Sequence, residues 1–331
     1  MTQPGERSLQ SFLQNPSSII DHSRRFNHNY TVLGVCNGLV CLQDSHRGDD
    51  FEELWVRFWN PSTRLMSEDS PRVRIHSNDS FVFGFGYDDW SDTYQVVLLD
   101  NKSQKMEVSV HSLGDSCWRN ILSCDAWVTL SLYGVYVCGT INWLTAPKSG
   151  SSYRGECFMN KLKIFSYDVK NEKCNYLSIP EVDCKLYVHV PAIEVLKECL
   201  YLSCHQLKQF LVWTMREFGV AKSWTSLLNI NWQDLEIHVP YGMSIVPVIL
   251  SISDNDNVMV IGYGTAFFLY NKKDNMIDRH KVFNISFLIS HTIMFKVWFC
   301  HIKILRLVKL CKRFWKYIEI CEYIEMDVYW D

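Results

Sequence analysis

The chain has 331 residues and a formal net charge of −3, with 47% hydrophobic and 21% charged residues. These values lie close to those of ordinary globular proteins, so they exclude a disordered chain and a strongly basic, polyanion-binding one. Aromatic residues make up 14% of the chain, and such residues favour pleated sheet over helix. We therefore expect a globular, β-rich fold.

The first 12 residues contain no apolar core of a secretory signal, which predicts an intracellular protein, in the cytoplasm or the nucleus. In that reducing environment the 13 cysteines are expected to be mostly small buried side chains rather than disulfides. The closest pairs, Cys36 with Cys41 and Cys199 with Cys204, have no second pair at zinc-site spacing. No structural metal is therefore predicted.

A weak repeat begins near residue 31 and continues along most of the chain. In each copy a short apolar strand ends at a small polar residue whose side chain can start a turn. These residues are Asn60, Ser112, Asp168, Thr214 and Asn271, which are 52, 56, 46 and 57 residues apart. A period near 50 is typical of kelch-type propeller blades, each a four-stranded antiparallel sheet.

A second set of hairpins is predicted between these turns, with apolar runs on either side of a glycine or polar turn. The hairpins cover residues 32–42, 81–97, 133–144, 192–202 and 248–260. Two hairpins in each repeat predict an all-β, kelch-like propeller of five readable four-stranded blades, with a sixth only if the weakly patterned ends supply one. A pair of β-sandwiches or a barrel would also give many short strands, but the regular spacing favours the propeller.

No catalytic or cofactor-binding motif stands out in the sequence. Gly84-Phe85-Gly86 lacks the third glycine and the following helix of a dinucleotide fingerprint. Nucleophile-elbow, phosphate-loop and zinc-protease motifs are absent, and the 11 histidines show no paired spacing. Basic residues do not cluster with aromatic ones as on a nucleic-acid-binding face. We predict no catalytic residue, no cofactor, no metal and no nucleic-acid partner.

Several segments resemble the plant F-box associated interaction domain, in that family's order. They are Gly34–Cys41, Trp59–Arg64, Gly84–Asp88, Val110–Leu113, Gly134–Leu144 and Val212–Met215. The resemblance predicts three parts: a polar N-terminal remnant without an F-box (1–30), the F-box associated β-propeller (31–283) and a divergent apolar and basic tail (284–331).

The physical role expected for these motifs is structural. Asn60-Pro61 is predicted to begin a type I turn, and Asn37-Gly38 to form a tight hairpin turn with positive φ. Trp118, Trp143 and Trp224 are predicted to pack between blades, because large aromatic side chains dominate core burial.

The resemblance implies a protein-binding module that performs no chemistry and holds no cofactor. In this family a helical F-box docks onto the Skp adaptor of a cullin-based, SCF-type ubiquitin ligase, and the associated domain captures the target protein. Residues 1–30 lack a leucine- and proline-rich F-box, so the chain alone is expected not to bind the adaptor. A target that it captured would then be shielded from a complete F-box relative instead of being delivered to the ligase. The target and its binding residues are not predicted, but specificity is expected in loops such as Asp44–Glu53 and Pro147–Cys157.

Two alternatives to this function remain open. The chain could be a truncated, non-functional relative, or a propeller lectin or copper-dependent oxidase, since fold does not fix function. An oxidase would need His, Tyr and Cys ligands that converge at one mouth of the propeller. The tail from Lys296 to Trp330 approaches the spacing of a basic amphipathic helix, but a segment unrelated to the family explains it equally well, so no membrane partner is predicted.

Overall fold

The structure is a computed structural model, and the residues that it describes lie between 30 and 281. Within that span the description leaves out 61, 64, 103–104, 126, 132, 148–155, 182–186, 207–208, 232–247, 254–256, 264–265 and 275. The predictions made for residues 1–29 and for the tail 284–331 concern parts of the chain outside the described residues.

The described residues form 23 strands in four sheets, with two short 3₁₀ helices and no α-helix. The first sheet contains β1 (Thr31–Cys36), β2 (Leu39–Arg47), β3 (Phe51–Asn60), β4 (Leu65–Met66) and β5 (Val73–His76). The second contains β6 (Ser80–Asp88), β7 (Thr93–Asn101), β8 (Lys105–Ser112), β9 (Arg119–Asp125), β10 (Trp127–Thr129), β11 (Tyr133–Val137), β12 (Thr140–Pro147), β14 (Lys163–Asp168) and β15 (Lys173–Leu177).

The third sheet contains β13 (Glu156–Phe158), β16 (Tyr187–Leu196), β17 (Cys199–Gln206), β18 (Gln209–Met215) and β19 (Trp224–Asn231). The fourth contains β20 (Val248–Ile252), β21 (Val258–Tyr263), β22 (Ala266–Asn271) and β23 (Met276–Lys281). The 3₁₀ helices are η2 (Met159–Lys161) and η3 (Ala221–Ser223).

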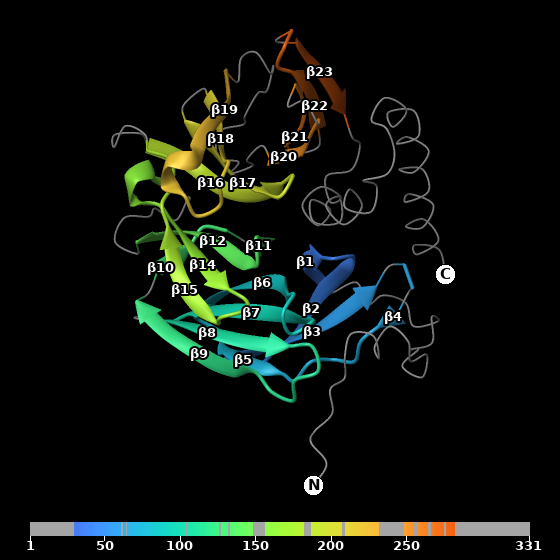
Figure 1. Ribbon diagram of the computed structural model, residues 1–331. Helices are drawn as coiled ribbons and strands as arrows, with labels where there is room; N and C mark the ends of the chain where they lie inside the picture. The colour runs from blue at the N-terminus through green and yellow to red at the C-terminus, as the bar shows by residue number, and fades with distance from the viewer. Residues whose placement is uncertain are drawn as a thin grey trace.

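These sheets contain five runs of four antiparallel strands, which we number units 1 to 5. The units are β1 to β4, β6 to β9, β11-β12-β14-β15, β16 to β19 and β20 to β23. They follow one another in chain order around a common centre (Figure 1). The all-β fold and the predicted hairpins are thus confirmed, whereas the number of blades in a closed propeller stays a prediction.

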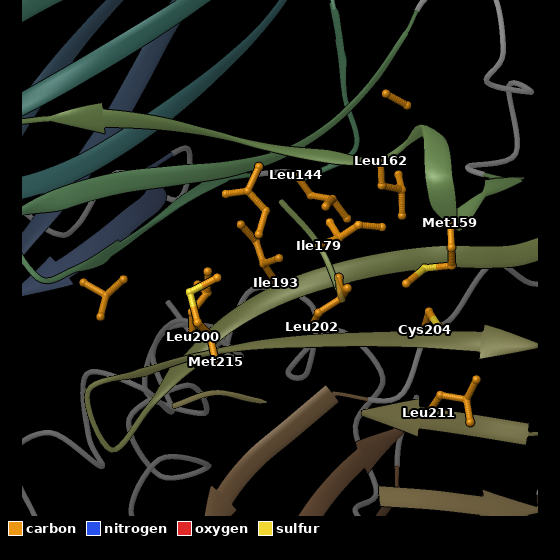
Figure 2. Close-up of a cluster of buried hydrophobic side chains, with 13 residues drawn as sticks. Leu144, Met159, Leu162, Ile179, Ile193, Leu200, Leu202, Cys204, Leu211 and Met215 are labelled. Carbon is orange, nitrogen blue, oxygen red and sulfur yellow. The ribbon is translucent and has the colours of Figure 1, made fainter. Parts of the chain in front are cut away.

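The hydrophobic core of the described residues is divided among four clusters, and each cluster lies between two successive units. Leu33 and Phe85 share the first cluster, and Val97 and Phe165 the second. Figure 2 shows the third, in which Leu144 of β12 and Leu162, directly before β14, face Leu200 and Leu202 of β17. The fourth joins units 4 and 5. Units 2, 3 and 4 each contribute to two clusters and so bury both faces against their neighbours, which explains the nearly continuous apolar run in β7.

Three tryptophans connect successive units, as predicted. The indole N–H of Trp118 donates to the carbonyl of Pro71 at 2.7 Å, across the junction of units 1 and 2. That of Trp224 donates to the carbonyl of Ser178 at 2.9 Å, across the junction of units 3 and 4. Trp143 is fully buried between units 2 and 3, and its indole N–H donates to the carbonyl of Phe83 at 3.2 Å.

Units 2 and 3 are fused into one sheet by a parallel pairing of β6 with β11, which the sequence did not predict. Gly84 lies opposite Gly134 in this pairing. Both glycines adjoin Trp143 and Ile141, and a Cβ atom on Gly84 would lie 2.4 Å from each of these two side chains. The glycines therefore allow the two inner strands to approach each other over a bulky buried indole.

The predicted turn-starting residues behave in two ways. The side-chain oxygens of Asn60, Asp168 and Asn271 accept backbone N–H groups two or three residues ahead, as predicted. A turn does start at Ser112, where β8 ends and the carbonyl accepts the N–H of Asp115 at 2.9 Å, whereas for Thr214 the prediction was wrong. The side chain that holds the turn after Ser112 is that of Asp115, whose carboxylate accepts the N–H of Ser112. Thr214 is buried inside β18, because this strand continues to Met215, which pairs with Trp224 of β19.

Three inner hairpins turn through two residues with positive φ. Two of these turns end in glycine, Asn37-Gly38 with φ of 46° and 80°, and Cys138-Gly139 with 49° and 73°. The third, Lys197-Glu198, has φ of 48° and 62° with no glycine at either position. A left-handed conformation costs a residue with a side chain about 1 to 2 kcal/mol.

Replacing Glu198 with glycine is therefore expected to raise the free energy of unfolding by about 1 kcal/mol, which corresponds to about 2 °C in Tm. Thermal and urea denaturation would measure the change. Glu198→Ala is the control, because alanine removes the charge and keeps the strain. An equal gain for both variants would show that the backbone conformation is not the cause.

Candidate protein-binding surfaces

One exposed tryptophan stands out on the turn between β6 and β7. Trp90 is 78% exposed, far more than the other large hydrophobic side chains that the structure describes. The turn beneath it is held by Asp88, whose carboxylate accepts the N–H of Trp90 at 2.9 Å and the hydroxyl of Ser91 at 2.5 Å. The ring is thus presented to solvent from a fixed backbone.

A lysine from a neighbouring turn lies against this ring, and ion pairs extend from that turn to β9. The ammonium of Lys170, on the β14–β15 turn, lies 4.4 Å from the Trp90 ring centroid, which is cation–π distance. On the same turn Glu172 accepts two hydrogen bonds from the guanidinium of Arg119, at 2.7 and 3.2 Å. Arg119 also lies 3.8 Å from Asp115. We call these five residues the Trp90 surface.

A tyrosine at the base of the same turn is similarly fixed. The hydroxyl of Tyr87 donates to the carboxylate of Asp92 at 2.5 Å, and this hydrogen bond is the main cause that raises the pKa of Tyr87 to about 12. The carbonyl of Tyr87 accepts the hydroxyl of Tyr136 at 2.6 Å, so units 2 and 3 are joined directly behind the turn. The Trp90 surface therefore rests on a rigid base.

A second surface feature is a groove between units 3 and 4. It consists of two adjoining cavities of about 360 and 380 Å³ that share Pro180 and Glu181. The segment Ser178–Glu181 forms its floor, and Tyr176 of β15 borders one end, with Trp213 and Trp224 of β18 and β19 at the other. We call this feature the aromatic groove.

The two predicted specificity loops are placed differently. Asp44–Glu53 is not a loop: β2 and β3 pair from Asp44↔Trp55 to Arg47↔Glu52, and only residues 48–50 connect them. This prediction was wrong because β3 is lengthened by pairing with β5, where Arg72 and Arg74 donate to Glu53. The two hydrogen bonds from Arg74 and Arg72 are the main cause that lowers the pKa of Glu53.

The other predicted loop lies partly outside the described residues. Pro147 is the last residue of β12, Glu156–Cys157 belong to β13, and 148–155 are not described. This loop leads directly into Phe158 and η2, and Asn160 of η2 lines the aromatic groove. That specificity lies in this segment stays a prediction, and the aromatic residues of the groove come from other segments.

The chemical groups in the described residues form no recognisable reaction site. Within them no three His, Cys, Asp or Glu side chains lie together as a metal ion would require. His111 is buried, its ring lies 5.3 Å from that of Trp118, and burial lowers its pKa. Of the described free cysteines, Cys36, Cys41 and Cys204 are buried as expected, whereas Cys117 and Cys138 are exposed.

No described segment forms a helix that is long and apolar enough to span a membrane. Two solved structures show a distant likeness to this chain. A Synechocystis apocarotenoid oxygenase is 9% identical with a TM-score of 0.44, over 78% of this chain and 62% of that one. An α-L-arabinofuranosidase from Lactobacillus brevis is 11% identical with a TM-score of 0.33, over 76% of this chain and 89% of that one. At these scores neither carries an argument about chemistry.

Comparison with curated proteins gives closer relatives, all from Arabidopsis thaliana. The F-box/kelch-repeat protein At3g23880 is 34% identical over 209 residues, which is 61% of this chain and 53% of the relative. The F-box protein CPR1 is 26% identical over 242 residues, 65% of this chain and 55% of the relative. The chain thus spans about half the length of these relatives. The model of the F-box associated beta propeller domain matches residues 3–194, more than half of the chain, so the chain belongs to that family.

Proposed function

We propose that this chain is a protein-binding module that captures a target protein for an SCF-type ubiquitin ligase and performs no chemistry itself. The observation that carries the proposal is the family match over residues 3–194, together with relatives that are named F-box proteins. The link to the ligase in this proposal is the family's F-box, which docks on the Skp adaptor; no F-box is predicted in residues 1–30, so the ligase role is tested with a complete F-box placed before the chain. The place of action is the cytoplasm or nucleus, where exposed thiols such as Cys117 and Cys138 stay reduced.

Within this proposal the Trp90 surface is the main contact for the target. Tryptophan is enriched among the few interface residues that carry most of the binding energy. A ring that is held on a fixed turn loses little conformational freedom on binding, so more of its contact energy is retained in the complex. Lys170 against the ring, with the Arg119–Glu172 ion pair that includes a residue of the same turn, supplies polar groups for the rim of the contact.

Replacing Trp90 with alanine is expected to weaken target capture about tenfold or more, because a buried interface anchor typically contributes over 1.4 kcal/mol. The stability should stay nearly unchanged, since the ring is mostly exposed. The measurement is affinity capture from plant tissue with the full chain and the variant, quantified by mass spectrometry, with Tm recorded for both.

Phe51→Ala is the matched control. Phe51 lies at the end of another hairpin, and its ring is likewise in contact with a cation, the guanidinium of Arg74, 4.5 Å from the ring centroid. This variant should leave capture unchanged. The captured proteins are then offered to a ligase assembled on a chimera in which a complete F-box precedes the full chain. Capture that is insensitive to Trp90→Ala would remove the proposed surface, and captured proteins that the chimera never ubiquitinates would remove the ligase role.

A further inference from the structure

The aromatic groove has a fixed shape before any partner binds. Its floor residue Ile179 and its wall residue Leu162 also belong to the core cluster between units 3 and 4 (Figure 2). The hydrogen bond from the indole of Trp224 to the carbonyl of Ser178 joins one wall to the floor. The 3₁₀ helix η3 beside Trp224 is held by Ser223, whose hydroxyl donates to the carbonyl of Glu217 at 2.8 Å. A ligand would therefore meet a preformed trough.

The aromatic side chains of the groove are only partly covered by the protein. Tyr176 is 40% exposed, and its ring lies edge-on to the buried Phe165 at 5.5 Å. Trp213 and Trp224 are intermediate in exposure and stand on adjacent strands of one hairpin. Grooves bordered by successive aromatic rings suit extended segments that contain proline, because the polyproline helix is already ordered and its rings stack on aromatic faces.

The charges at the groove favour an acidic partner. Among the described residues that line the two cavities, Lys163 and Lys222 are exposed cations and Glu181 is the one carboxylate. The ammonium of Lys163 lies 5.6 Å from the Tyr176 ring centroid, so this cation is held next to an aromatic ring. A third exposed lysine, Lys161, lies over Phe158 at the same end of unit 3.

From these observations we infer that the aromatic groove binds an extended, acidic, proline-containing segment of a partner protein. The prolines pack on Tyr176, Trp213 and Trp224, and the carboxylates pair with Lys163 and Lys222. The groove lies on different residues from the Trp90 surface, so the inference adds a second contact to the proposed function and does not depend on the ligase role. A target with such a segment would be held at two places, which raises its overall affinity.

The test uses fluorescence anisotropy with the full chain and three labelled synthetic peptides, made of six Glu-Pro, six Lys-Pro or six Glu-Gly repeats. We expect the Glu-Pro peptide to bind at least tenfold more tightly than the other two. The double variant Lys163→Glu with Lys222→Glu should reverse the preference to the Lys-Pro peptide. The double variant Lys105→Glu with Lys272→Glu has the same change in net charge at exposed sites elsewhere and should behave as the wild type.

The ring contribution is tested separately at Tyr176, an exposed position on an edge strand where substitution leaves the fold intact. Tyr176→Ser should weaken Glu-Pro binding about tenfold, whereas Tyr176→Phe, which keeps the ring, should bind the peptide as tightly as the wild type does. Absence of binding, equal binding of the Glu-Pro and Glu-Gly peptides, or an equal loss in the control double variant would overturn the inference. Trp90→Ala should leave peptide binding unchanged, so this result and the capture result can fail independently.

Discussion

Replacing Gly84 with alanine is expected to lower the free energy of unfolding by about 3 kcal/mol or more, the upper range for overpacking a well-filled core. A Cβ atom at this position would lie 2.4 Å from Cγ2 of Ile141 and 2.4 Å from Cζ2 of Trp143. Both side chains are fully buried, so neither can move aside without opening the core between units 2 and 3. Equilibrium urea denaturation would measure the loss.

Gly134→Ala should have a similar effect, because its Cβ would lie 2.5 Å from the indole of Trp143. The control is Gly38→Ala. Gly38 has φ of +80° and no atom within 4 Å of its Cβ position, so this variant carries only the backbone cost, about 1 kcal/mol. If Gly84→Ala loses no more stability than Gly38→Ala, the close packing of β6 against β11 is not what requires glycine.

The hairpins could be predicted from the sequence because their signals are local. Alternating apolar residues give each strand its faces, and pairs such as Asn37-Gly38 give the turn between them. The fusion of units 2 and 3 could not be predicted in this way. It depends on Gly84 and Gly134 meeting over Trp143, and the glycines are 50 residues apart in the chain.

The candidate surfaces were harder to predict than the fold. Tryptophan is usually buried, so the exposure of Trp90 is not expected from its type, and only the polar residues on both sides of it could have indicated an exposed turn. The aromatic groove combines Tyr176 and Pro180 with Trp213 and Trp224 from the next unit. To predict that these residues lie together, one must know how two sheets are placed relative to each other. The spacing of motifs along the chain does not give that placement.

Stability is expected to depend on pH through one buried carboxyl group, Asp100 on β7. Asp100 is 8% exposed, and its Oδ1 has no hydrogen-bond partner among the described residues. The ammonium of Lys102 lies 3.9 Å from Oδ2 and donates instead to Glu107 at 2.6 Å. Burial raises the pKa of Asp100 to about 6, the charge of Lys102 opposes this shift, and Asp79 and Glu107 add to it.

The sign of the effect follows from proton binding. An aspartate in the unfolded chain has a pKa near 3.9, so between pH 4 and 6 the folded chain binds more protons and its free energy of unfolding falls as the pH rises. The ionised Asp100 lowers the free energy of unfolding by about 3 kcal/mol at pH 7.5 and by about 1.5 kcal/mol at pH 5. Asp100→Asn cannot ionise, so it should be more stable than the wild type by up to these amounts, with the difference vanishing below pH 4.

Urea denaturation of both proteins between pH 5 and 7.5 would measure this difference. Other shifted carboxyl groups, such as that of Glu53 with its lowered pKa, are common to both proteins and cancel in the comparison. Asp125→Asn serves as the control, because Asp125 is exposed on β9 and its replacement should change stability by no more than about 0.5 kcal/mol at either pH. A gain in Asp100→Asn that is the same at both pH values would mean that the shape or hydrogen bonding of the new side chain, and not the buried charge, is responsible.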